Sequence, residues 1–98
     1  MADSVLTDYR GRRIVLSDAT WYGHIVKGHP DLAGKRTLAE RTLATSTSVF
    51  MSSSDPSCRL YYGPKQPDGL MICVVADIVN GFVKTAYFST RIKPGAAE

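Results

Sequence analysis

The sequence has little of what marks a secreted, membrane-spanning or metal-rich protein. Its 98 residues include only two cysteines and two histidines. Cys58 and Cys73 form no CxxC pair or zinc-ligand cluster, so a disulfide framework is not indicated. No apolar run approaches the roughly 20 residues that span a bilayer, and the opening "MADSVLTDYRGRR" lacks the apolar segment of a signal peptide. We therefore expect a cytoplasmic protein without membrane association.

The motifs of several common enzyme classes are also missing. There is no GxSxG, and the turn-rich "GPKQPDG" leads into a predicted strand instead of the helix that follows a phosphate-binding loop. The formal net charge is +3, with a sequence pI of about 9.0. This charge favours an anionic partner, such as nucleic acid or an acidic protein inhibitor. Ordinary solubilising charge explains it equally well.

The sequence does contain enough apolar residues, 44%, for the core of one domain. We expect a single domain over residues 1–98, ordered over about 9–93, with 1–8 and 94–98 loose. Capping residues and helix-favouring composition predict helices over about 19–27 and 35–45. Apolar runs separated by turns then predict four strands: "SVFMSS", "CRLYYG", "LMICVVADIV" and "FVKTAYFSTRI". An earlier run, "RRIVLS", predicts an extended segment or edge strand. This order predicts an α+β fold, with two N-terminal helices packed on a four-stranded antiparallel sheet.

Asn80-Gly81 predicts a hairpin with a two-residue type I′ turn. That register places Asp77 opposite Lys84, a favourable cross-strand pair. It also puts a largely polar row on one face of the last strand: Val83, Thr85, Tyr87, Ser89 and Arg91. A solvated face on an outer strand would show the same pattern.

Both histidines lie in "WYGHIVKGHP", where three interpretations compete. A metal site is disfavoured, because His24 and His29 are five residues apart, have no co-ligand between them, and would point in different directions on a regular helix. Acid/base chemistry fits better, because histidine can donate and accept protons near neutral pH. RNA carries its own nucleophile, the 2′-OH, so its cleavage needs only a base, an acid and a cation, with no metal or cofactor. The remaining interpretation is structural: His24 is a half-buried helix residue and His29 is a loop residue bonded to the backbone.

The order "WYGHIVKGHPDL", then "LYY", then "VKTAYFSTRIKPG" resembles small phage and mobile-element domains of the barnase–EndoU–colicin–RelE-like nuclease fold. The resemblance covers about residues 9–95. It departs at Asp31, where Glu is common, and at "ATSTSVFMSSSDPS", where a proline-led turn is common. It implies a RelE/barnase-like layout and metal-independent ribonuclease activity. The histidines that it implies fall on His24 and His29, its T-A-Y on Thr85 and Tyr87, and its sheet tyrosine on Tyr61 or Tyr62.

These observations give the hypothesis of a small endoribonuclease toxin that uses no cofactor. Its candidate catalytic residues are His24, His29, Thr85, Tyr87 and Arg91. Its candidate substrate-binding residues are Arg59, Tyr62, Lys84 and Ser89. The expected partners are an RNA substrate and a protein antitoxin that covers the basic site. The alternative is a non-catalytic RNA- or protein-binding module on the same fold.

Overall fold

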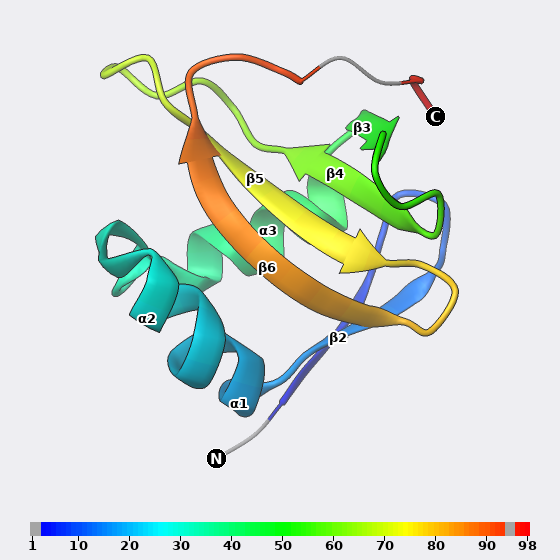
Figure 1. Ribbon diagram of the computed structural model, residues 1–98, viewed down its shortest axis with the longest axis horizontal. Helices are drawn as coiled ribbons and strands as arrows, with labels where there is room; N and C mark the ends of the chain where they lie inside the picture. Colours follow the sequence, from blue (N-terminus) through cyan, green and yellow to red (C-terminus); the bar gives the residue numbers. More distant parts are fainter. Residues whose placement is uncertain (1–2, 94–95) are drawn as a thin grey trace.

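The computed structural model describes residues 3–93 and 96–98, which form an α+β fold around one six-stranded mixed sheet (Figure 1). In space the strands follow the order β1-β2-β6-β5-β4-β3. Their bounds are β1 Ser4–Thr7, β2 Arg13–Leu16, β3 Ser48–Met51, β4 Cys58–Tyr62, β5 Met71–Asp77 and β6 Phe82–Ser89. The pair β2–β6 is parallel, and the other neighbouring pairs are antiparallel.

The expected four-stranded antiparallel sheet under two N-terminal helices is therefore wrong. Two N-terminal strands extend the sheet, and β2 joins it in parallel through Val15, which lies opposite Phe82. A tight turn holds β1 against β2: Asp8 Oδ1 accepts the backbone N–H groups of Arg10 and Arg12, and Gly11 takes a φ of +79°. The alternating exposure of a four-residue strand is too short a signal to separate β1 from a loose lead-in.

Described residues near both ends of the chain take part in the sheet. β1 lies within the segment 1–8 that we expected to be loose, and residues 96–98 pair with the outer edge of β3. There the Met51 N–H donates to the Ala96 carbonyl at 2.8 Å, and the Glu98 N–H donates to the Val49 carbonyl at 2.9 Å. The expectation for residues 1, 2, 94 and 95 lies outside the described residues.

A continuous helical stretch follows β2 and consists of α1 (Asp18–Thr20), the π-helical turn η1 (Trp21–Ile25) and α2 (Val26–Gly28). It begins where Ser17 Oγ accepts the Thr20 N–H at 3.0 Å. It ends at His29, whose φ of −135° leaves the helical region before Pro30. A 3-10 turn, η2 (Pro30–Leu32), then leads to the ten-residue α3 (Arg36–Thr45). None of the helices in the described residues is long and apolar enough to cross a membrane.

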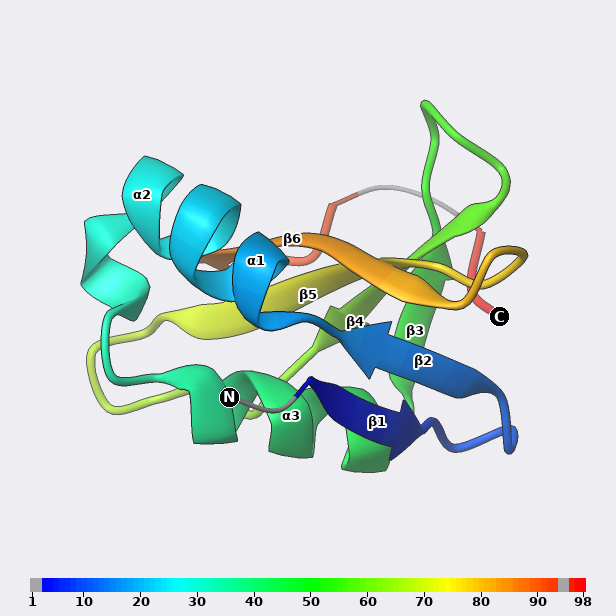
Figure 2. The ribbon, with the colours of Figure 1, turned by 90° about the horizontal axis from the view of Figure 1, so that it is seen from below.

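The main core lies between one face of the sheet and the helices. α3 runs along this face beside β1, while α1, η1 and α2 lie beside β6 (Figures 1 and 2). Trp21, Leu43 and Tyr61 are each no more than 1% exposed in this core. β2 pairs with β6 only near the start of that strand, at Phe82, so the helical stretch flanks the rest of it. This arrangement brings the end of α2 toward the end of β6.

A second, smaller cluster lies on the other face of the sheet. Leu60, Tyr62 and Cys73 are buried there, with Phe50, Val75 and Tyr87 packed against them. Strand alternation explains the division, because Tyr61 enters the main core while its neighbours Leu60 and Tyr62 enter the second cluster. The sheet therefore separates two apolar clusters, and the second one is the floor of the candidate site.

The expected two-residue hairpin turn between β5 and β6 is also wrong. The turn has four residues, Ile78 to Gly81, because the carboxylate of Asp77 accepts the backbone N–H groups of Val79 and Asn80 at 2.9 Å each. A bulge follows: Val75 lies opposite Thr85, but Ala76 lies opposite Val83. Lys84 is thus the extra residue and pairs with Asp55 at 3.6 Å, not with Asp77. As a result, Thr85 lies opposite Val75 and Tyr87 lies opposite Cys73. The expected turn would have placed Ala76 and Val74 at these positions.

An ion network ties the β1–β2 turn to the end of the chain. Glu98 accepts hydrogen bonds from the guanidinium groups of Arg12 and Arg59. Arg12 also pairs with the buried Asp8 at 2.7 Å, and the Tyr61 hydroxyl donates to the same carboxylate at 2.6 Å. Burial opposes ionisation of Asp8, but the hydrogen bonds from Tyr61 and Arg12 keep its pKa below the ordinary value. The network thus fixes the turn and the last residues to one side of the sheet.

Candidate active site

A row of three side chains crosses the outer face of the sheet. Tyr62 on β4 lies opposite Cys73 on β5, and Cys73 lies opposite Tyr87 on β6. Cys73 is fully buried, Tyr62 is 3% exposed, and Tyr87 is half-buried at the side nearest α2. The row therefore leads from two buried side chains, Tyr62 and Cys73, to the partly exposed Tyr87.

Two basic residues lie close to the ring of Tyr87. The His29 ring centroid lies 6.2 Å from the Tyr87 centroid, with the planes tilted by 38°. The Lys93 ammonium lies 4.9 Å from the same centroid, within cation–π range. The Lys93 backbone N–H also donates to the Tyr62 hydroxyl at 3.0 Å, which holds this part of the chain over the row. A proton-transfer group and a cation are thereby gathered around one aromatic residue.

The environment keeps the row uncharged at neutral pH. Burial raises the pKa values of Tyr62, Cys73 and Tyr87 above their ordinary values, and a hydrogen bond with Cys73 raises that of Tyr87 further. The Cys73 group is therefore a thiol, a poor nucleophile compared with a thiolate. The Tyr87 phenol keeps its proton and is hydrogen-bonded with Cys73, so it can donate to an anionic oxygen only by exchanging this partner.

A cavity of about 180 Å³ adjoins this row. Leu60 and Val75 form its apolar floor, Tyr87 and Lys93 line it, and Ser52 to Ser54 of the β3–β4 loop supply its remaining lining. Ser52 Oγ accepts the backbone N–H of Asp55 at 3.3 Å, which orders this loop. Hydroxyls, a phenol and an ammonium around an apolar floor can bind an anionic group attached to an aromatic one.

The structure gathers several of the predicted site residues. Tyr62, Tyr87 and His29 belong to the cluster just described, and Thr85 precedes Tyr87 by two residues on the same face of β6. Ser89 ends this strand, and its hydroxyl donates to the Arg91 carbonyl at 2.6 Å. Ser89 therefore stabilises the turn out of β6.

The structure does not bring the other predicted residues into this cluster. His24 is exposed on η1, and its side chain makes no hydrogen bond, ion pair or ring contact with any described residue. Arg91 is likewise exposed. Arg59 pairs with Glu98 at 2.6 Å. It is three residues from Tyr62 on β4, so the two side chains lie on opposite faces of the sheet. Lys84 pairs with Asp55 at the far end of β6.

Lys93, the place of Cys73 between Tyr62 and Tyr87, and the serines of the β3–β4 loop were not predicted from the sequence as parts of the site. Lys93 follows β6, near the segment that we expected to be loose, and its contact with Tyr87 depends on how the chain returns over the sheet. Cys73 is a buried core residue, and only the strand register shows that it lies between two tyrosines. The basic segment "RIK" after the tyrosine strand was the available signal for Lys93.

Within residues 3–93 and 96–98, no three His, Cys, Asp or Glu side chains are grouped so that they could hold a metal ion. Comparisons of the chain with known protein families, curated proteins and solved structures found no match. The resemblance to nuclease domains thus rests on the short motifs quoted above.

Proposed function

We propose that the protein is a small metal-independent endoribonuclease of the toxin type, with the cluster of His29, Tyr87 and Lys93 as its active site. The observation that carries the proposal is the placement of a histidine and an ammonium close to the ring of one half-buried tyrosine. RNA cleavage by its own 2′-OH requires these group types: a proton-transfer residue, a hydrogen-bond donor and a cation.

In the proposed reaction the 2′-oxygen bonds to phosphorus while the bond from phosphorus to the 5′-oxygen breaks. The proton of the 2′-OH passes to a base, and an acid supplies a proton to the departing 5′-oxygen. His29 carries one of these transfers, and Lys93 and the Tyr87 phenol stabilise the negative charge on the phosphate oxygens. The products are a 2′,3′-cyclic phosphate and a 5′-OH. The cavity beside Tyr87 holds the group next to the scissile phosphate.

Cleavage of total RNA in the presence of EDTA, with mapping of the product ends, tests this proposal. We expect fragments with 2′,3′-cyclic phosphate ends from the wild-type protein. His29→Ala should cleave about 10²- to 10⁴-fold more slowly, the usual effect of losing a general acid or base. Lys27→Ala, which removes an exposed charge from the same helical stretch, is the matched control and should stay within about twofold. A His29→Ala protein that cleaves at the wild-type rate would refute the assignment.

His24→Ala decides where the second proton transfer occurs. If this variant also loses cleavage, substrate binding brings the exposed His24 to the cluster, as the sequence hypothesis requires. If it retains cleavage, the second transfer involves another group or water. Growth arrest on expression of the wild-type protein, relieved by His29→Ala, would support the toxin setting separately.

The second candidate is a non-catalytic RNA-binding module. It is favoured by the absence of His24 from the cluster, which leaves one histidine beside Tyr87. RNA bound with salt-dependent affinity but left intact over hours in both EDTA and magnesium would establish this candidate.

A further inference from the structure

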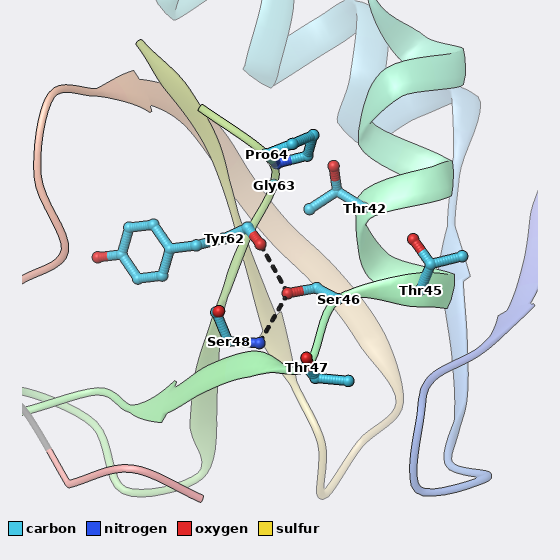
Figure 3. Close-up of a pocket in the computed structure, with 8 residues that line it drawn as sticks. All are labelled: Thr42, Thr45, Ser46, Thr47, Ser48, Tyr62, Gly63 and Pro64. Atoms are coloured by element: carbon cyan, nitrogen blue, oxygen red, sulfur yellow. Dashed lines mark hydrogen bonds between the residues drawn. The ribbon is translucent and has the colours of Figure 1, made fainter. Parts of the chain in front are cut away.

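A second cavity, of about 240 Å³, lies where the last turn of α3 meets the ends of β3 and β4 (Figure 3). No residue that lines it is charged, and five of the eight are serine or threonine. Thr45, Thr47 and Ser48 form exposed parts of its wall, while Thr42 is only 2% exposed. The cavity is therefore a neutral, hydroxyl-lined site that the proposed reaction does not use.

The hydroxyl of Thr42 has no hydrogen-bond partner among the described residues, although its oxygen is buried. A Cβ at Gly63 would lie 2.8 Å from Thr42 Oγ1, so this hydroxyl lies beside Gly63 in the wall of the cavity. By contrast, Ser46 Oγ donates to the Tyr62 carbonyl at 2.6 Å, and Thr45 Oγ1 donates to the Arg41 carbonyl at 2.7 Å. A buried hydroxyl without a partner is costly, so a native protein usually supplies one. At Thr42 a bound molecule would satisfy this need.

The position of the cavity selects against anions. Its wall includes Thr42 and Thr45 from the last turn of α3, where the helix dipole is negative and where no basic residue lies. A phosphate would meet this negative end without a cation to offset it. A neutral group with both donors and acceptors suits the lining better, because each hydroxyl can donate and accept.

The size of the cavity limits the ligand to a small fragment. Sites for drug-sized molecules enclose about 300–1,000 Å³, more than is found here. Single-stranded RNA presents fragments of the required kind, because its unstacked bases expose neutral edges that carry donors and acceptors. We propose that this cavity binds one nucleobase of the RNA, with Thr42 Oγ1 as the buried hydrogen-bonding group that reads its edge.

Tyr62 connects this base site with the proposed active site, and here the inference rests on the proposed function. Its hydroxyl accepts the Lys93 N–H on the outer face, while its carbonyl accepts Ser46 Oγ at the wall of the cavity. The same residue thus contributes to both places. A base held in the cavity would belong to a nucleotide some distance along the strand from the phosphate at Tyr87.

The test is a titration of the wild-type protein with each of the four ribonucleosides, followed by the backbone amide signals of Thr45, Thr47 and Ser48 in nitrogen–proton NMR spectra. D-Ribose and inorganic phosphate serve as separate probes. We expect at least one nucleoside to shift these three signals, and neither ribose nor phosphate to do so. Thr42→Val should weaken that binding by about tenfold or more, the effect of losing one buried hydrogen bond.

Thr42→Val keeps the branched shape of the side chain and removes only an unpaired hydroxyl, so its thermal stability should equal or exceed that of the wild type. If it does not fold, Thr47→Val at the exposed part of the wall replaces it. Thr37→Val is the matched control, an exposed position at the other end of α3, and should bind as the wild type does.

Three outcomes overturn the base site: no nucleoside shifts the signals, ribose shifts them equally, or binding survives in the folded Thr42 variant. This assay needs no cleavage, so its result is separate from that of the proposed function. Nucleoside binding without RNA cleavage would refute the nuclease and support the base site. RNA cleavage without nucleoside binding in the cavity would support the nuclease and refute the base site.

Discussion

At the scale of single residues, Tyr61 shows how the fold satisfies a buried charge. Its side chain is fully buried, and its hydroxyl donates to Asp8 Oδ2 at 2.6 Å. We expect Tyr61→Phe to lower the free energy of unfolding by about 1.5–3 kcal/mol, the usual range for a hydrogen bond to a charged group. Urea unfolding followed by circular dichroism measures this loss. Tyr9→Phe, which removes an exposed hydroxyl bonded to Glu98, is the control, and an equal loss in both variants would contradict the prediction.

Glu98 makes the stability of the protein depend on acid pH. Hydrogen bonds from Arg12 and Arg59 outweigh burial and lower its pKa from 4.5 to about 2. Because the folded-state pKa is the lower one, ionised Glu98 stabilises the fold above about pH 4.5, and this contribution disappears as the pH falls toward 2. Between pH 5 and 2.5 the wild type should therefore lose more stability than Glu98→Gln. Parallel pH profiles of unfolding free energy for the two proteins would refute this.

At the scale of elements, two glycines should respond oppositely to alanine. Gly81 ends the β5–β6 turn with a φ of +77°, and a Cβ there would lie 3.0 Å from the Arg13 carbonyl oxygen. Gly81→Ala should destabilise the protein by about 1–2 kcal/mol. Gly23 lies in η1, where a Cβ would meet nothing within 4 Å, so Gly23→Ala should stabilise it by about 0.5–1 kcal/mol. Thermal unfolding of both variants checks the two signs, and a shared sign would contradict the argument.

The elements that sequence reasoning located well are those fixed by local chemistry. The helical stretch runs from Asp18 to Gly28, close to the predicted 19–27, because Ser17 caps its start and Pro30 prevents its continuation. The β5–β6 turn was misjudged because the Asp77 side chain replaces part of the backbone pairing that Asn80-Gly81 suggested. β1 was missed because its four residues gain their stability from distant segments, through pairing with β2 and packing against α3.

At the scale of the whole molecule, the sequence predicted contacts between nearby residues better than contacts between residues far apart in the chain. Because successive side chains of a strand point to opposite faces, the sequence alone was enough to predict that Thr85 and Tyr87 share one face. Other contacts depend on how distant segments pack against β6. His29 lies beside Tyr87, and Lys93 contacts both Tyr62 and Tyr87. The two histidines looked equivalent in sequence, yet only His29 lies beside Tyr87, because the chain leaves the helix there. Such placements require the tertiary structure.

The single parallel contact between Val15 and Phe82 has a consequence for the order of folding. The strands β3 to β6 pair with their immediate neighbours in the chain, whereas β2 must close a long loop to reach β6. We therefore expect β2 to dock after the rate-limiting step. Ile14→Val in β2 should mainly speed unfolding, while Val74→Ala in β5 should mainly slow folding, as stopped-flow refolding can measure. During folding, the strands β3 to β6 would then pair first, and the hairpin formed by β1 and β2 would join the sheet last.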